Sequence, residues 1–382
     1  MADHHFLIKN IRIFNKDGNT PSAVLVKNGK ISEINPEKEE KGIQSFDGSG
    51  YQLIPGLIDL HIHGANGLDM MDGTEESIME VSRSCAATGC TSFLATSVTS
   101  SLPQLLKMIV AVKAVKGKEP GARIAGMHLE GPYLHPKRKG MQNETHLRHP
   151  DIGEMNSILQ AGGDLIKMVT IAPELPGGFQ LIKFLKEKGI IVSIAHSEAN
   201  YDEALEAFSC GASHITHCFN AMRPIHHRDP GLIVAAFEDH KVSVQAIVDD
   251  VHLHPAIVRL MYKIKGPDKM VLVTDAMQAM GMGDGYYDFG GHKVVVKNGI
   301  ATLQDGTLAS STITLNKAIK KTVACGIPLQ EAILMASKTP ADILGLSNKG
   351  MLMPGADADL VLLNEDYQVI WTMIDGKFVY ER

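Results

Sequence analysis

The feature that most constrains this chain is the alternation of apolar segments with amphipathic stretches through its middle. Eight apolar segments each end in a polar cluster: Leu57–His63, Ser92–Ser97, Ile124–Glu130, Ile166–Ala172, Ile190–His196, His214–Asn220, Val242–Asp249 and Met270–Asp275. Because a helix-like stretch follows each segment, the pattern predicts a parallel sheet, and eight such units in about 220 residues fit a (β/α)8 TIM-type barrel of the α/β class. A doubly wound open sheet is the alternative, but no GxGxxG motif follows the first strand.

Two of the intervening stretches carry local helix signals. Tyr201–Cys210 follows Asn200, a favourable N-cap, and Glu203 stands where a capping box needs an acid. Leu102–Val115 has Pro103 in its first turn, where a missing amide hydrogen costs nothing. Both stretches are therefore predicted to be helices.

The two ends of the chain show a different, strand-rich pattern. Strand-like segments and turns are Phe6–Phe14, Lys16–Asn19 (turn), Ala23–Lys27, Asn28–Gly29 (turn), Lys30–Ile34, Ala358–Leu363, Val369–Ile374, Asp375–Gly376 (turn) and Phe378–Tyr380. An Asn-Gly pair between alternating apolar residues is a strong hairpin signal. We therefore predict a small β-sandwich domain built from residues 1–54 and 354–382, with the barrel spanning 55–353.

Composition limits the classes of partner. The formal net charge of −6 excludes a globally basic surface for nucleic acid, so an anionic substrate needs a local cationic pocket. The five cysteines form no CxxC pair, which is typical of a reducing compartment. Met1–Phe6 lacks a signal-peptide pattern and no apolar run reaches transmembrane length. The expected location is the cytoplasm, with no membrane partner.

The barrel prediction requires functional groups at the carboxyl ends of the strands. The residues that lie there are His61, His63, Glu130, His196, His217 and Asp275. His61 and His63 face the same way because side chains alternate along a strand. Taken singly, each has an ordinary interpretation, such as a core histidine or an exposed loop glutamate. His214, three residues before His217, faces oppositely and is expected to be structural.

Taken together, these residues indicate metal-assisted hydrolysis. Neutral imidazoles and carboxylate oxygens suit Zn²⁺ or Fe²⁺, and a bound metal lowers the pKa of water toward neutrality. Glu130 is a carboxylate that can bridge two ions. Asp275 is the natural general base for the attacking water and then the general acid for the leaving group.

Several motifs carry a family resemblance. Pro55-Gly-Leu-Ile-Asp-Leu-His-Ile-His-Gly64 and Pro354-Gly-Ala-Asp-Ala-Asp-Leu-Val361 resemble the amidohydrolase superfamily. Within it, five segments in order are similar to the N-acetylglucosamine-6-phosphate deacetylases: His128–Tyr133, Ala195–Ser197, Thr216–Met222, Val273–Ala276 and Asp305–Ser310. The resemblance covers nearly the whole chain. It implies a hydrolase of linear amides in amino-sugar catabolism, which converts N-acetylglucosamine 6-phosphate into glucosamine 6-phosphate and acetate.

The resemblance also implies roles for single residues. Glu130, His196 and His217 match the ligands of the principal metal, and His61 and His63 match those of a second ion found in some members. Asp275 matches the proton-transferring acid. The residues that match substrate contacts are Met141, Gln142, Asn220, Ala221, His252, Leu308, Ala309, Ser310 and Ser311. One or two divalent ions, Zn²⁺ or Fe²⁺, are the expected cofactors.

Two further features concern the substrate end of the site. Arg228 matches a phosphate-binding arginine that the family supplies from a neighbouring subunit, which implies a homodimer, and His226 and His227 adjoin it. Some members carry a carbonyl-polarising histidine where this chain has Gln142, so activation by a metal is favoured here. The charge run 137–139 is expected to be an exposed, mobile loop.

Two other functions stay open at this point. One is another barrel amidohydrolase, such as a cyclic-amide hydrolase or a nucleobase deaminase. Cyclic-amide hydrolases of the superfamily usually bridge two metals with a modified lysine, and no lysine ends a predicted barrel strand. The other is a non-catalytic binding protein that kept the barrel; loss of a ligand or of Asp275 would favour it, and neither is lost.

Overall fold

The computed structural model describes residues 5–13, 21–37 and 43–382. Eight parallel strands form its central sheet in the order β15-β14-β13-β12-β11-β10-β9-β6. Their bounds are β6 Leu57–Ile62, β9 Cys90–Ser97, β10 Arg123–Glu130, β11 Ile166–Ile171, β12 Ile191–Ile194, β13 His214–Ile215, β14 Ser243–Ala246 and β15 Met270–Leu272. The two edges meet through a parallel bridge between Ile62 and Ala276 and a 2.8 Å hydrogen bond from Asp275 N to the His61 carbonyl. This closure confirms the predicted barrel.

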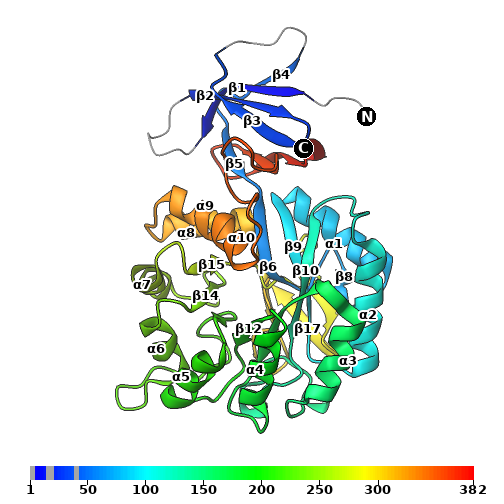
Figure 1. Ribbon diagram of the computed structural model, residues 1–382, viewed down its shortest axis with the longest axis vertical. Helices are drawn as coiled ribbons and strands as arrows, with labels where there is room; N and C mark the ends of the chain where they lie inside the picture. Colours follow the sequence, from blue (N-terminus) through cyan, green and yellow to red (C-terminus); the bar gives the residue numbers. More distant parts are fainter. Residues whose placement is uncertain (1–4, 14–20, 38–42) are drawn as a thin grey trace.

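Helices surround this barrel (Figure 1). They are α1 Glu75–Ala87, α2 Leu102–Val115, α3 Ile152–Gly162, α4 Gly178–Glu187, α5 Tyr201–Cys210, α6 Gly231–Glu238, α7 Pro255–Lys265, α8 Leu315–Ala324, α9 Leu329–Ala336 and α10 Lys338–Ile343. The predicted capping box of α5 is confirmed: Glu203 N donates to the Asn200 side chain at 2.9 Å, and Asn200 N donates to the Glu203 carboxylate at 2.8 Å. Among the described residues, no helix combines the length and apolar character needed to cross a membrane.

The two ends of the chain build one shared sheet, as predicted. Its strands are β1 Phe6–Ile13, β2 Pro21–Lys27, β3 Lys30–Ile34, β4 Gln44–Asp47, β5 Gln52–Pro55, β19 Leu360–Leu363, β20 Val369–Ile374 and β21 Lys377–Glu381. The order is β21-β20-β19-β5-β1-β2-β3, and β4 pairs with β1 beside this path. The β5–β19 pair joins the two ends of the chain. The predicted turn Lys16–Asn19 and the strand end at Phe14 lie outside the described residues.

The junction between the two sheets sets which end of the barrel is free. β5 continues through Gly56 directly into β6, so the terminal sheet lies at the end where the barrel strands begin (Figure 1). A Cβ atom at Gly56 would lie 2.2 Å from the Thr91 hydroxyl oxygen, so only glycine fits this crossing. The carboxyl ends of the strands therefore open on the opposite side.

One element was not predicted from the sequence. β16 (Gly285–Phe289), β17 (His292–Lys297) and β18 (Ile300–Thr302) form an antiparallel sheet after the last barrel strand. The pair Asn298–Gly299, between alternating valines and Ile300, is a hairpin signal that could have revealed part of it. The ring of Phe289 lies 5.4 Å from that of His63, so this sheet covers one side of the strand-end cluster.

A buried ion pair holds the end of the chain at the junction. The Asp359 side chain is 3% exposed and accepts hydrogen bonds from Lys349 Nζ at 2.5 Å and Asp375 N at 3.0 Å. The Asp359 carbonyl accepts from Gly56 N at 2.8 Å, next to the entry of β6. Burial raises the pKa of Asp359, and the Lys349 ammonium opposes that rise.

We predict that Lys349→Met lowers the free energy of unfolding by about 3–5 kcal/mol, because it leaves a buried carboxylate unpaired. The pKa of Asp359 in the folded variant rises further above its unfolded value. The loss of stability is therefore greater at pH 8 than at pH 5, where protonation relieves the charge. Denaturant unfolding at both pH values measures this.

Lys338→Met is the matched control. Its ammonium pairs with Asp342 on α10 between partly exposed side chains, so the expected loss is at most about 0.5 kcal/mol. Equal losses in the two variants at both pH values would contradict the prediction.

Candidate active site

A pocket of about 320 Å³ opens at the carboxyl ends of the barrel strands. It brings together residues that are far apart in the sequence. Those predicted from the sequence are Glu130, Met141, Gln142, His196, His217, Asn220, Ala221, His252, Asp275, Leu308 and Ser310. The pocket therefore collects side chains from several strand ends and from the loops that follow them.

One group of ligand-type atoms lies on the floor of this pocket. Glu130 ends β10, His196 follows β12 by two residues, and His217 follows β13 by two residues. Glu130 Oε1 lies 2.9 Å from His217 Nε2 and 3.2 Å from His196 Nε2, and the two nitrogens are 3.1 Å apart. These three atoms could hold one metal ion.

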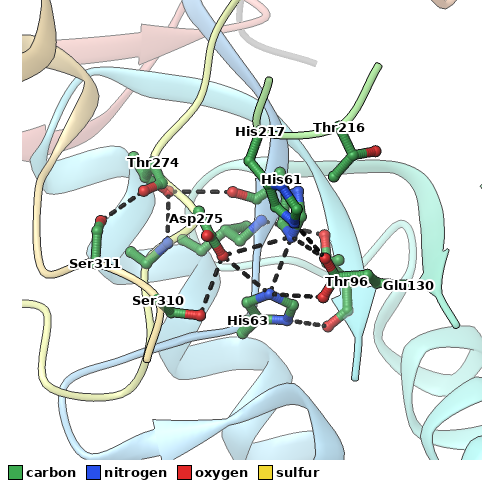
Figure 2. A network of polar contacts seen from close by, with 12 residues as sticks. His61, His63, Thr96, Glu130, Thr216, His217, Thr274, Asp275, Ser310 and Ser311 are labelled. Atoms are coloured by element: carbon green, nitrogen blue, oxygen red, sulfur yellow. Dashed lines mark hydrogen bonds and ion pairs between the residues drawn. The ribbon is translucent and has the colours of Figure 1, made fainter. Parts of the chain in front are cut away.

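A second group lies beside the first (Figure 2). His61 and His63 project from the end of β6, with their Nε2 atoms 3.0 Å apart. Asp275 Oδ1 lies 3.1 Å from His63 Nε2 and 3.5 Å from His61 Nε2. Glu130 stands between the groups, with Oε1 3.8 Å from His61 Nε2 and Oε2 3.6 Å from His63 Nε2. The geometry thus fits a carboxylate shared by two ion sites.

Hydrogen bonds fix the tautomers of three of these histidines. Each Nδ1 faces an oxygen that can only accept: the Gln245 side-chain oxygen for His61 (3.1 Å), the Thr96 carbonyl for His63 (3.3 Å) and the Arg138 carbonyl for His196 (2.7 Å). The Gln245 oxygen is identified because it also accepts from His217 N at 3.2 Å. In each neutral ring the proton therefore sits on Nδ1, and the Nε2 lone pair points inward.

This arrangement gives a direct test of whether a metal fits. The inward Nε2 lone pairs of His61, His63 and His196 meet the carboxylate oxygens of Glu130 and Asp275, which are also acceptors. Neutral rings in this arrangement need a positive charge between them and the carboxylates, which a proton on an imidazole or a bound metal ion can supply. Imidazole nitrogens with carboxylate oxygens are donors that divalent transition metals take. The residues present therefore fit a divalent ion.

The electrostatics of the floor agree with this. Burial raises the pKa of Asp275, but His61 and His63 outweigh burial and lower it to about 2. Burial also raises the pKa of Glu130, and the surrounding histidines hold it well below its usual range. Burial lowers the pKa of His61 to about 4. Burial also lowers the pKa of His63, but the Asp275 carboxylate outweighs burial and raises it to about 9, so positive charge is favoured between these two groups. Both carboxyl groups are thus ionised at neutral pH and present negative charge to a cation.

The backbone at the strand ends is strained. His196, His217, Asp275 and Ser310 have φ values of 48°, 31°, 48° and 59°. Non-glycine residues rarely adopt this left-handed region, and such strain concentrates at functional sites. Here the sharp turns carry the side chains from the strand ends into the pocket.

Gln142 is held in one orientation. Its side-chain oxygen accepts from Thr99 N at 2.7 Å, so its NH₂ group faces inward and donates to Glu130 Oε2 at 2.6 Å. The sequence placed Gln142 where some family members have a carbonyl-polarising histidine. In this structure its donor is directed at the shared carboxylate, which it helps to orient.

Two predicted substrate contacts do not line the pocket within the described part of the chain. Ala309 is fully buried, and its amide donates to the Ala301 carbonyl at 3.0 Å. Ser311 is 2% exposed, and its hydroxyl donates to the Thr274 carbonyl at 2.5 Å. Ser310 between them does face the pocket and donates to Asp275 Oδ1 at 3.1 Å (Figure 2). The alternation of side chains along this segment turns the two neighbours away.

The remaining predictions fall outside the pocket. Arg228 is exposed, with its guanidinium 2.6 Å from His227 Nε2, and it does not line the pocket of its own chain as far as the structure describes it. A contribution across a subunit interface stays a prediction. His214 is buried, with Nδ1 2.6 Å from the Ser243 hydroxyl oxygen, which agrees with a structural role.

Sequence reasoning missed several residues of the site. Lys137, Arg138, Gly140 and Thr307 line the pocket, so the run 137–139 is not simply an exposed loop. Asp59 was also missed: it accepts from His61 N at 3.1 Å and from the Thr274 hydroxyl at 2.6 Å, linking the two strand ends that carry ligands. A signal for Asp59 existed, because an acid inside an apolar strand needs partners.

Comparisons with known proteins agree with this geometry. The family model described as the Amidohydrolase family matches residues 52–379. The N-acetylglucosamine-6-phosphate deacetylase of Lysinibacillus sphaericus is 37% identical, with 97% of each chain covered. The N-acetylgalactosamine-6-phosphate deacetylase of Escherichia coli O157:H7 is 35% identical, with 85% of this chain and 87% of the relative covered.

A solved structure is similar over almost the same span. A mutant of the N-acetyl-D-glucosamine-6-phosphate deacetylase from Mycobacterium smegmatis, in complex with N-acetyl-D-glucosamine-6-phosphate, superposes with a TM-score of 0.91 at 34% identity. The match covers 98% of this chain and 99% of that one. The chain therefore belongs to the amidohydrolase family and, within it, to the group that contains the N-acetylglucosamine-6-phosphate deacetylases.

Proposed function

We propose that this chain is a metal-dependent deacetylase that hydrolyses the acetamide of N-acetylglucosamine 6-phosphate to glucosamine 6-phosphate and acetate. The observation that carries the proposal is the pair of adjacent ligand groups at the pocket floor, with Glu130 of one group 3.8 Å from His61 and 3.6 Å from His63 of the other. Relatives whose names state this activity cover nearly the whole chain, and one related structure holds this sugar phosphate.

The residues of the chain account for the proton transfers. A divalent ion held by the ligand groups supplies polarisation of the acetyl carbonyl and acidification of water. The Asp275 carboxylate, ionised at neutral pH and held by Ser310, takes one proton from the attacking water. The water oxygen forms a bond to the acetyl carbon, and the carbon–nitrogen bond breaks. Asp275 then delivers the proton to the departing nitrogen, so the products are an amine and acetic acid, which releases the second proton of the water as it ionises to acetate.

We also propose one or two ions per chain, Zn²⁺ or Fe²⁺. Four imidazoles and two carboxylates form two groups, each with three ligand atoms within 4.8 Å of one another. Ligands of these types suit both metals. Gln142 supports a metal as the activator of the carbonyl, because its donor is engaged by Glu130.

The proposal also covers the oligomeric state, the cellular location and the domain division of the chain. We propose a homodimer in which Arg228 reaches the pocket of the neighbouring subunit; its exposure and its absence from its own pocket support this. We propose a cytoplasmic protein, supported by five cysteines that are all free and buried. We keep the division into a terminal β domain, 1–54 and 354–382, and a barrel domain, 55–353.

An activity assay tests the function. Purified protein with measured metal content is given N-acetylglucosamine 6-phosphate, N-acetylgalactosamine 6-phosphate or unphosphorylated N-acetylglucosamine. The proposal expects release of acetate fastest from the first. A preference for the galactosamine phosphate would instead place the chain with the Escherichia coli relative. Release from neither phosphate would refute the proposal.

The metal proposal predicts that protein purified without added metal contains at least one tightly bound divalent ion per chain. His196→Ala removes a ligand whose Nε2 lone pair points inward, so metal content should fall by about one ion per chain. His240→Ala, at an exposed histidine, is the control and should keep wild-type content. Elemental analysis of both variants decides this, and full metal content in His196→Ala would count against the ligand role.

The role of Asp275 predicts a separation of turnover from binding. Asp275→Asn keeps the shape of the side chain but cannot take up a proton. We expect kcat to fall by about a hundredfold to ten-thousandfold, with substrate binding retained. Asp268→Asn, at an exposed turn, should change neither quantity. Calorimetric binding beside steady-state kinetics tests this, and a kcat near that of the wild type would exclude the role.

A further inference from the structure

The charges of the pocket are divided between its floor and its edge. The floor carries the ionised carboxylates of Glu130 and Asp275. Of the residues in the described chain that line the pocket, Lys137 and Arg138 alone carry an ammonium or guanidinium group. A substrate with an amide at one end and a phosphate at the other matches this division, because its amide must reach the floor and its phosphate then lies toward the edge where the two cations are.

Arg138 is engaged in holding the edge of the pocket together. Its guanidinium pairs with the Glu198 carboxylate, and Glu198 N donates to Glu174 Oε1 at 2.6 Å. The Arg138 carbonyl accepts from His196 Nδ1 at 2.7 Å. The guanidinium and the carbonyl of Arg138 thus both have partners within the protein, and Arg138 holds the loop against His196.

Lys137, unlike Arg138, has a side chain that is not engaged in an ion pair among the described residues. It lies in the short 3₁₀ turn Pro136–Arg138, and its side chain is exposed, with no acidic partner among the described residues. Two hydrogen bonds hold the turn against His196. His135 N donates to the His196 carbonyl at 2.9 Å, and the Arg138 carbonyl accepts from His196 Nδ1. Lys137 thus lines the pocket edge with no acidic partner in the described chain, on a backbone that hydrogen bonds hold against His196.

We propose that Lys137 recognises the phosphate group of the substrate from within the same chain. The inference rests on the proposed function, which supplies a sugar phosphate as substrate. An ammonium binds phosphate as a compact point charge and needs no bidentate geometry. Phosphate recognition would then not depend on the neighbouring subunit alone, and Arg228 would add to a charge already present in each pocket.

The test compares two lysines of the same loop. Lys137→Met should lower kcat/KM for N-acetylglucosamine 6-phosphate by about tenfold, mainly through KM, as expected for loss of a hydrogen bond to a charged group. For unphosphorylated N-acetylglucosamine the change should stay within about twofold. Lys137→Arg should restore most of the loss. Lys139→Met is the control, because Lys139 pairs with Glu144 at 2.7 Å and does not line the pocket.

Metal content is measured in every variant, because a disturbed turn would also disturb His196. The inference is upheld if Lys137→Met keeps wild-type metal content while its preference for the phosphorylated sugar falls by about tenfold. It is overturned if that preference is unchanged, or if both sugars lose equally. A wild type that deacetylates neither sugar overturns the proposed function itself, so the two failures are distinguishable.

Discussion

The site depends on one constraint: lone pairs of imidazoles and carboxylates are forced to face one another around Glu130. The Nδ1 atoms of His61, His63 and His196 donate to fixed oxygens, so these rings cannot turn their protons inward. The resulting cluster of acceptors is unfavourable unless a proton or a metal ion supplies positive charge between them. Oxygens of the surrounding barrel and loops accept the outer hydrogen bonds of the rings and hold the rings in this orientation. The site is therefore preorganised for an ion before one binds.

The backbone contacts that close the barrel also bring the second ligand group together. Asp275 N bonds to the His61 carbonyl, and His63 N bonds to the Ala276 carbonyl, at 2.8 and 2.9 Å. Asp59 adds a third link through Thr274. The first and last strands of the barrel thus bring the two histidines opposite Asp275. A chain that failed to close would lose the second ligand group, whatever its sequence at the other strand ends.

The sequence allowed the barrel and the strand-end groups to be predicted because both follow from local patterns. Apolar runs that end in His196, His217 or Asp275 can be recognised one at a time, and the barrel topology brings them together. The oxygens that accept from the histidine Nδ1 atoms could not be predicted in this way. The carbonyls of Thr96 and Arg138 belong to the backbone, which has no sequence signal, and the position of the Gln245 side chain depends on packing. The turn of Ala309 and Ser311 away from the pocket could not be foreseen, because a motif match does not say which side chains of a segment face the pocket; their role as substrate contacts stays a prediction.

The loop 135–142 connects the chemistry of the floor to recognition at the edge. It contacts the ligand groups at two points, through the Arg138 carbonyl on His196 and through Gln142 on Glu130. The same loop presents Lys137 to the pocket. Because a single rigid segment does both, a shift of the loop caused by a bound phosphate would change the geometry of His196 and Glu130 together. Under the proposed role of Lys137, substrate recognition and the geometry of His196 and Glu130 are coupled through this loop.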